Sequence, residues 1–436
     1  MRKLYFLSFL FFASCFSESN VEIGSGKTFI RYFNGGGNDK AVAFSETADK
    51  GLIILANSAF ADWGSIKLIK TDEQGNKVWS NIYSPPPQQP PILEIDSLKG
   101  YGLLVLPDDG GYVIAGQYEK GNVSQLLVKV IDANGGASKE KIYSTTEPLY
   151  ATTPGNPLQL QGKAITAIKD DAGKVTSYFV LANILNPTGL ENMLLAEINA
   201  SDLSLVWVRK YGAGQTSVLN KLFTVAAGKD ANNKTIYKAI WAGTVTRQSE
   251  KDMRLTKATQ NRQNVDFDLQ IGNPGFNETA HDICRFGFGY ALIGSTNETT
   301  AGTQDILFQR LGEDGSVISK QSFIIKTIFE NVEVEVLGDK TGNGLAVTQD
   351  GGLLLIGTVP TNEGLGFGRG KNDLYLIKMN AFGEVAWQKS IGSRDEDVGV
   401  AALQASDGGY LLLGTSLFAG LKTVLLIKTD SDGNIN

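Results

Sequence analysis

The chain has a single histidine, His281, three residues before one of its two cysteines, Cys284. Such a pair could hold a metal ion or act as a nucleophile with its general base. Both residues fall in a strand-like segment, where positions an odd number apart point to opposite faces unless a bulge intervenes. A structural zinc site also needs more ligands than the neighbouring sequence offers. We expect His281 to be structural or channel-lining, Cys284 to pack as a small apolar residue, and neither to be catalytic or metal-binding.

Aspartates recur at one position of a repeated pattern. Two carboxylates at a suitable separation could perform acid–base glycoside chemistry. Recurrence at one position instead favours hairpin turns, where Asp supports the local backbone geometry. The same interpretation covers Asp314 and Asp432, each followed by Gly, because the sequence lacks the ligand ladder of an EF-hand calcium loop. The recurring residues are Asp49, Asp108, Asp109, Asp170, Asp171, Asp350 and Asp407.

Two further segments have unusual composition. Residues 364–371, Gly-Leu-Gly-Phe-Gly-Arg-Gly-Lys, resemble a phosphate-binding loop but match neither the P-loop spacing nor G-x-G-x-x-G. We expect a flexible loop between two strands there. Residues 85–91 are rich in proline and predict a stiff extended segment, either a rigid connection between repeats or a partner-binding loop. The sequence thus predicts no catalytic residue and no cofactor.

Composition excludes several classes of protein. The chain has 436 residues, 42% of them apolar, with 50 Gly and two Cys, which is unlike a disordered, collagen-like or disulfide-stapled protein. Its 40 basic and 46 acidic residues give a net charge of −6. Nucleic acid is therefore not an expected partner.

The first residues predict an export signal. Arg2 and Lys3 precede an apolar run over residues 4–12, which is too short to span a membrane. The following Ala13-Ser14-Cys15 resembles the lipobox of bacterial lipoproteins, which implies cleavage before Cys15 and acylation of that residue. Residues 1–14 would then be the signal peptide, residues 15–27 a lipidated tether, and residues 28–436 the folded domain. An ordinary cleaved signal with an incidental cysteine is the alternative.

The residues after Cys15 indicate the membrane in which we expect the protein to be anchored. Phe16 stands where Asp favours inner-membrane retention, and Ser17-Glu18-Ser19 resembles export signals of Bacteroidetes surface lipoproteins. We therefore expect lipid anchoring at the bacterial outer membrane, with the cell surface as one option. Several acyl chains on one residue suffice for stable attachment. Since lipid would occupy the Cys15 sulfur, Cys284 has no partner and we expect no disulfide.

A repeat of about sixty residues organises the rest of the chain. Each copy has an apolar run ending in a small residue, a loop, a second apolar run, and a glycine turn often followed by Trp. The spacings between successive small residues are 60, 66, 61, 51, 63 and 57, so there are seven copies. The aligned small residues are Ala56, Gly116, Ala182, Gly243, Gly294, Gly357 and Gly414.

Each copy contains four strand-sized runs rich in Val, Ile, Leu and aromatic residues, separated by Gly, Asp and Asn turns. Four strands repeated seven times predict a seven-bladed β-propeller. The last copy ends after its third strand, whereas residues 28–35 resemble an unattached fourth strand. We therefore predict an all-β ring closed by this N-terminal strand, which pairs its free edges.

The repeats resemble a known group, the bacterial surface and secreted proteins with delta-60 or quinoprotein-like propeller repeats. The matching residues are Asp407-Gly408-Gly409-Tyr410 before the second strand, Leu426-Ile427-Lys428-Thr429-Asp430 in the third, and Gly383 followed by Trp387 into the fourth. The resemblance covers nearly the whole chain after the tether. It implies the fold and an extracytoplasmic setting, and it brings no catalytic motif.

These features predict a non-enzymatic outer-membrane lipoprotein, acting as a binding or assembly module for a membrane protein complex or a surface glycan. A carbohydrate-active hydrolase or lyase on the same scaffold is the alternative. Clustered acidic and aromatic side chains at one mouth of the channel would favour the enzyme.

Overall fold

The chain is a β-propeller in a computed structural model that describes residues 20–23, 28–60, 63–85, 96–107, 110–121, 123–143, 159–185, 192–211, 216–247, 249–259, 265–299 and 302–435. These residues form strands, turns and one 3-10 turn, η2 (Glu363–Leu365), with no α-helix among them. Accordingly, none of the described segments is a helix able to cross a membrane.

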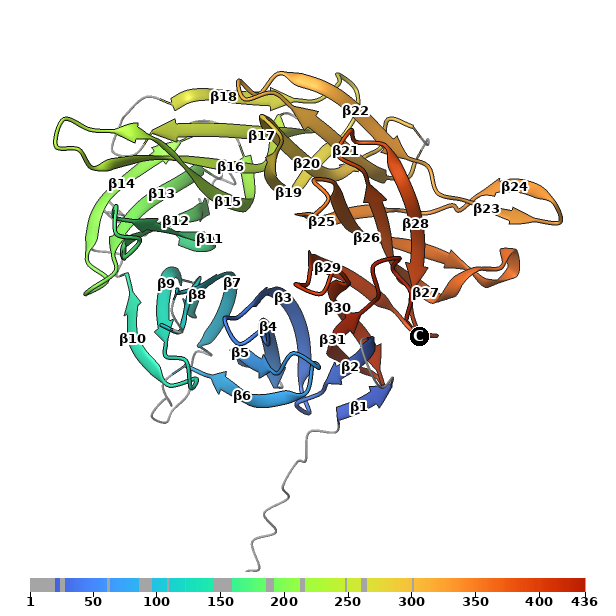
Figure 1. Cartoon of the computed structure of the whole chain (residues 1–436), viewed down its shortest axis with the longest axis horizontal. Helices are drawn as coiled ribbons and strands as arrows, with labels where there is room; N and C mark the ends of the chain where they lie inside the picture. The colour runs from blue at the N-terminus through green and yellow to red at the C-terminus, as the bar shows by residue number, and fades with distance from the viewer. Residues whose placement is uncertain are drawn as a thin grey trace, which may run out of the picture.

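Seven antiparallel sheets surround a central axis, as predicted (Figure 1). In blades 1 to 6, four strands follow one another from the axis outward. Blade 1 has β3 (Asn38–Glu46), β4 (Leu52–Phe60), β5 (Trp63–Thr71) and β6 (Lys77–Tyr83), and blade 2 has β7 (Ser97–Val105), β8 (Tyr112–Lys120), β9 (Val123–Ile131) and β10 (Ala137–Ile142). Blade 3 has β11 (Gln159–Lys169), β12 (Val175–Leu185), β13 (Asn192–Asn199) and β14 (Leu205–Tyr211), and blade 4 has β15 (Thr216–Lys229), β16 (Thr235–Arg247), β17 (Glu250–Thr259) and β18 (Val265–Ile271). Blade 5 has β19 (Glu278–Phe286), β20 (Gly289–Thr296), β21 (Asp305–Leu311) and β22 (Val317–Phe323), and blade 6 has β25 (Thr341–Val347), β26 (Leu353–Asn362), β27 (Phe367–Met379) and β28 (Val385–Ile391).

Blade 7 combines the two ends of the chain, which confirms the predicted closure. Its inner strands are β29 (Asp397–Gln404), β30 (Tyr410–Phe418) and β31 (Leu421–Lys428), and its fourth strand is β2 (Phe29–Phe33). Phe29 pairs with Lys428 and Phe33 with Val424 in an antiparallel ladder. A fifth strand, β1 (Asn20–Ile23), pairs with the outer edge of β2. The sequence did not predict β1, which lies within the segment that we expected to be tether.

The hydrophobic core consists of seven clusters, one at each interface between neighbouring blades. Strand β26 shows how the sequence produces this arrangement. Leu353 and Leu355 pack toward blade 5, whereas Leu354 and Ile356 pack toward blade 7. Because both faces of a second strand are buried, its side chains form a continuous apolar run and not an alternating one.

The recurrent Gly and Trp of the repeat lie against each other across blade interfaces. Gly433, in the last turn of blade 7, has a φ of 76°, and a Cβ atom there would lie 2.7 Å from the ring of Trp387 in blade 6. Phe29 occupies the corresponding position in β2, where a Cβ atom on Gly75 of blade 1 would lie 2.4 Å from its ring. The N-terminal strand therefore supplies both the ladder and the aromatic contact that join blade 7 to blade 1.

Antiparallel connections give the ring two different faces. One face, which we call the turn face, carries the tight turns between the first and second and between the third and fourth strands of each blade. The other, the connection face, carries the links between second and third strands and from one blade to the next. A separate hairpin of β23 (Lys326–Phe329) and β24 (Val332–Glu335) is inserted in the link from blade 5 to blade 6 and projects outward from the ring (Figure 1).

Candidate functional site

The innermost strand of every blade contains a bulge at the same repeat position. In each case the register to the second strand shifts by one residue, which leaves one extra residue directed at the axis. These seven bulge residues line a central cavity of about 180 Å³. They are Val42, Tyr101, Lys163, Asn220, His281, Asn343 and Val400.

Three consecutive bulge side chains bind the next blade in the same way. Asn220 donates to the carbonyl oxygen of Ala280, and Asn343 donates to that of Gly399 at 2.7 Å. His281 lies between them in the series, with its Nδ1 atom 2.8 Å from the carbonyl oxygen of Gly342. Since a carbonyl only accepts, Nδ1 carries the proton. His281 is therefore channel-lining on an innermost strand, as expected, and it makes the contact that asparagine makes on either side.

Burial governs the titration of this pair of residues. Burial lowers the pKa of His281 while the hydrogen bond to Gly342 raises it, and the net pKa lies below the usual value of 6.5. The ring is consequently neutral at pH 7. Cys284 packs beside the apolar cluster between blades 5 and 6, and burial raises the pKa of its thiol. A thiol held protonated in this way is a poor nucleophile.

A bulge between His281 and Cys284 could have turned both side chains to one face of the strand, and a bulge is present at His281 itself. Even so, His281 faces the channel and Cys284 packs against the core toward blade 6. Cys284 is a free thiol among the described residues, and Cys15, the other cysteine, lies outside them.

The predicted turn aspartates do occupy hairpin turns. The Asp350 carboxylate accepts hydrogen bonds from Thr348 Oγ1 and from the Gly352 N–H, and it pairs with Lys378 Nζ at 2.8 Å. Burial raises the pKa of Asp350, but these three donors outweigh it and lower the pKa to about 2. Asp49 and Asp407 form the same ion pair with Lys70 and Lys428 in their own blades.

Because each of these carboxylates is held by a lysine of its own blade, the set acts as repeated turn stabilisation. The lysine partner was not predicted from the sequence, although Lys428 belongs to the repeat motif. Asp170 accepts backbone N–H groups within its turn, and Asp171 pairs with Lys229 of blade 4 at 2.6 Å. Asp314 accepts from Ser316 in the last turn of blade 5.

The glycine-rich segment 364–371 differs from the expected flexible loop. It contains η2 and the first part of β27, which extends the hairpin of β26 and β27 beyond the body of blade 6 (Figure 1). Gly366, Gly368 and Gly370 have φ values of 70°, 66° and 76°, a conformation that glycine adopts without strain. Thus the glycines shape a bent strand. Cys15, residues 86–91, Asp108 and Asp109 lie outside the described residues.

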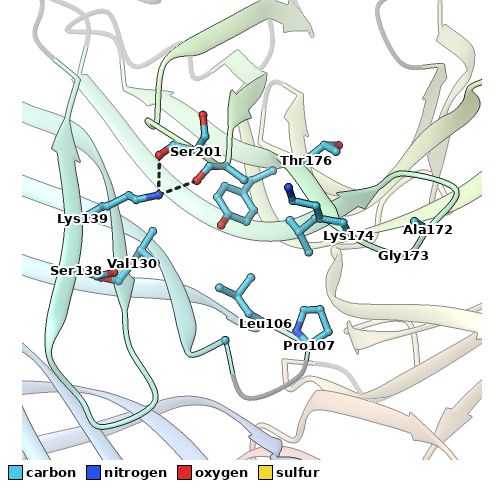
Figure 2. A pocket seen from close by; sticks show the side chains of 14 residues that line it. Leu106, Pro107, Val130, Ser138, Lys139, Ala172, Gly173, Lys174, Thr176 and Ser201 are labelled. Atoms are coloured by element: carbon cyan, nitrogen blue, oxygen red, sulfur yellow. Dashed lines mark hydrogen bonds between the residues drawn. The ribbon is translucent and has the colours of Figure 1, made fainter.

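An open recess of about 750 Å³ lies between blades 2 and 3 on the turn face (Figure 2). Its walls include Leu106, Val130 and Tyr178. Lys139 Nζ bridges it by donating to the carbonyl oxygens of Ser201, at 2.6 Å, and Ala200, at 3.3 Å. No carboxylate is among the described residues that line the recess, so it offers no carboxylate for acid–base chemistry.

Exposed apolar side chains gather at the inserted hairpin. Among the described residues, 14 large apolar side chains are exposed, and seven of them fall within residues 317–337. Ile328 is 75% exposed, Val332 61% and Leu337 70%. The other four are Val317, Ile318, Ile324 and Phe329. Ile324, Ile328, Phe329, Val332 and Leu337 lie on the hairpin and its two flanks, which together we call the blade 5 apolar patch. Val317 and Ile318 lie at the start of β22, beside a turn on the turn face.

Known proteins resemble this chain in architecture alone. No model of a protein family matches it, and no curated protein does. Among solved structures, a quinohemoprotein alcohol dehydrogenase from Pseudomonas putida HK5 is similar over 92% of this chain and 77% of its own, with 8% identity and a TM-score of 0.43. The periplasmic gluconolactonase PpgL of Pseudomonas aeruginosa is similar over 85% and 95%, with 12% identity and a TM-score of 0.43. A mutant sialidase of Trypanosoma rangeli is similar over 94% and 58%, with 12% identity and a TM-score of 0.44.

Proposed function

We propose that this chain is a non-enzymatic binding and assembly module, anchored by lipid on Cys15 at the bacterial outer membrane. Its partner is a protein of a membrane complex, and the contact surface is the blade 5 apolar patch. The observation that carries the proposal is the concentration of exposed apolar side chains at one inserted hairpin. Large exposed apolar surface is uncommon on monomeric proteins and marks interaction sites.

The chemistry of the patch favours a protein over a glycan. Its exposed side chains are mostly aliphatic, whereas sugar rings offer hydroxyl groups that need polar partners. β23 and β24 pair only with each other among the described strands, so each leaves one edge of backbone donors and acceptors unpaired. An incoming strand could add to such an edge.

The side chains best suited to catalysis already have structural partners, which supports a binding role. His281 donates to a backbone carbonyl, and the turn aspartates Asp49, Asp350 and Asp407 are paired with lysines. Among the described residues that line the channel, Asp282 is the only one with a carboxylate. This carboxylate accepts a hydrogen bond from the Leu345 N–H at 3.1 Å. The alternative, a carbohydrate-active hydrolase, needs two carboxylates about a substrate. A channel lined by one carboxylate does not favour the hydrolase.

Strand β1 suggests how the module would sit on a membrane. Asn20 pairs with Phe33, and the neighbouring Tyr32 stacks on Phe418, at the end of β30, with ring centroids 5.1 Å apart. The start of β1 therefore lies on the connection face of blade 7. Five residues, 15–19, precede it, and they span at most about 18 Å when fully extended.

The segment of residues 15–19 is short compared with the diameter of the ring. A compact domain of 409 residues (436 − 27) has a radius of gyration of about 22 Å, hence a diameter of roughly 55 Å. A lipid on Cys15 would hold the connection face of blade 7 toward the bilayer. The inserted hairpin belongs to a link on the same face, where it could meet a membrane-bound partner.

Affinity purification of the lipidated protein from native membranes tests the proposal. Charging the hairpin with Ile328→Lys and Val332→Lys should abolish recovery of the partner. The matched control is Phe288→Lys, since Phe288 is 91% exposed but lies in a turn on the opposite face, and it should retain the partner. Both variants should fold, because substitutions at exposed sites change stability little. Equal recovery by the double variant would contradict the proposal.

A further inference from the structure

Two buried aspartates meet between blades 6 and 7. Asp373 lies in β27 and Asp397 is the first residue of β29. A parallel bridge joins their predecessors, Asn372 and Glu396, so the two aspartates are neighbours on adjacent segments. Asp373 is 2% exposed and Asp397 is fully buried.

Each carboxylate has one oxygen with donors and one without. Asp373 Oδ2 accepts from Ser390 Oγ at 2.8 Å and from the Arg369 N–H at 3.2 Å. Asp397 Oδ2 accepts from the Ser393 N–H. The Oδ1 atoms of both residues are buried without a hydrogen-bond partner. Neither carboxylate lies within 4.0 Å of a cationic nitrogen in the described part of the chain.

The interface one blade earlier has an ammonium group at this place. Lys340 precedes the bulge residue of its blade by three positions, as Asp397 does in blade 7. Lys340 Nζ lies 2.8 Å from Asp305 Oδ1, and both side chains are fully buried. Asp305 pairs with the residue two beyond Gly294, and Asp373 with the residue two beyond Gly357, so their positions are also equivalent. Blade 7 thus presents a carboxylate where blade 6 presents an ammonium group.

Two adjacent buried carboxylates need a positive charge, because burying like charges without compensation is strongly unfavourable. Burial raises the pKa of Asp373, and the charge of Asp397 raises it further. The Ser390 and Arg369 hydrogen bonds and the charge of Arg369 lower it, but the net pKa stays above the usual value. The backbone also approaches closely. A Cβ atom on Gly392 would lie 1.9 Å from Asp373 Oδ1, so only glycine fits beside this unpartnered oxygen.

We propose that Asp373 and Asp397 bind a divalent cation, best matched by calcium, in place of the ammonium group found at the preceding interface. Calcium prefers carboxylate, backbone carbonyl and water oxygens and accepts irregular geometry, whereas magnesium demands a near-ideal octahedron. Extracellular calcium modules bind with dissociation constants of about 10⁻⁴ to 10⁻³ M. The ion would join the closing blade to its neighbour.

Thermal unfolding with EDTA or with millimolar CaCl₂ tests this proposal on the full chain. Calcium should raise the melting temperature of the parent, and calorimetric titration with CaCl₂ should give one site at these two residues. Asp397→Asn should lose both responses. Asp397→Lys should restore the arrangement of Lys340 and Asp305, and its melting temperature in EDTA should exceed that of the parent and not respond to calcium. Asp407→Asn, a turn aspartate on the opposite face, should respond like the parent.

Two results would overturn the proposal. If calcium does not stabilise the parent and Asp397→Asn is more stable than the parent in EDTA, the carboxylates share a proton and hold no ion. If Asp397→Asn responds to calcium like the parent, the ion binds elsewhere. Titration of the parent decides the question even if the lysine variant does not fold.

Discussion

Replacing Phe29 by Ala should weaken closure of the ring more than its position near a chain end suggests. Phe29 is 2% exposed, lies in the core cluster between blades 7 and 1, and packs over Gly75. Removing a buried Phe side chain costs about 3–5 kcal/mol, because apolar burial is lost and a cavity remains. For 409 residues, the entropy of unfolding at about 2.1 cal/mol/K per residue is about 0.86 kcal/mol/K, so the melting temperature should fall by about 3–6 °C.

Calorimetry of the parent, Phe29→Ala and Phe382→Ala measures this effect. Phe382 is 80% exposed, so its replacement should shift the melting temperature by less than about 1 °C. Deleting residues 28–33 removes Phe33 as well as the ladder to β31, and should lower it further. A deletion variant that melts within about a degree of the parent would refute the closure of the ring by β2.

Cys15→Ala should abolish acyl labelling and membrane retention in a fractionation assay, and unchanged labelling would reject the lipoprotein proposal. The pKa of His281 is lowered from 6.5, so its contribution to stability is present above pH 6.5 and is lost as the pH falls through the lowered pKa. His281→Asn should keep the contact to Gly342 and remove this acid sensitivity. If the stability of the parent and of His281→Asn changes in parallel from pH 7 to 5, the prediction is wrong. The pKa of Asp350 is lowered from 3.8 to about 2, so its contribution is lost as the pH falls from near 4 through 2, and Asp350→Asn should flatten the acid denaturation curve in that window.

The sequence could predict the ring because its repeat units are local. Strand runs, Asp turns and the glycine before Trp387 each arise from residues close together in the chain. The closure by β2 was also predictable, since residues 28–33 match the fourth strand that the last copy lacks. Strand β1 was not predictable in this way, because its four residues match no element of the repeat.

Neither the channel lining nor the pair of Asp373 and Asp397 could be predicted, because the residues of each come from different blades. The seven bulge residues are of five different types, ranging from Val42 to Lys163, so their common backbone geometry leaves no single composition signal. Asp373 and Asp397 are 24 positions apart and meet only through packing of blade 6 on blade 7. The recurrence of lysine near the end of the third strand was a usable signal, and it would have identified the partner of each turn aspartate.

Site-specific photo-crosslinking in native membranes tests the central claim most directly. A photoreactive residue at position 328, at the hairpin, is compared with one at position 382, on the turn face of blade 6. If the chain is an assembly module that binds through the blade 5 apolar patch, position 328 should link to one membrane-complex protein and position 382 should not. Crosslinks from both positions alike, or only to lipid from position 328, would contradict it.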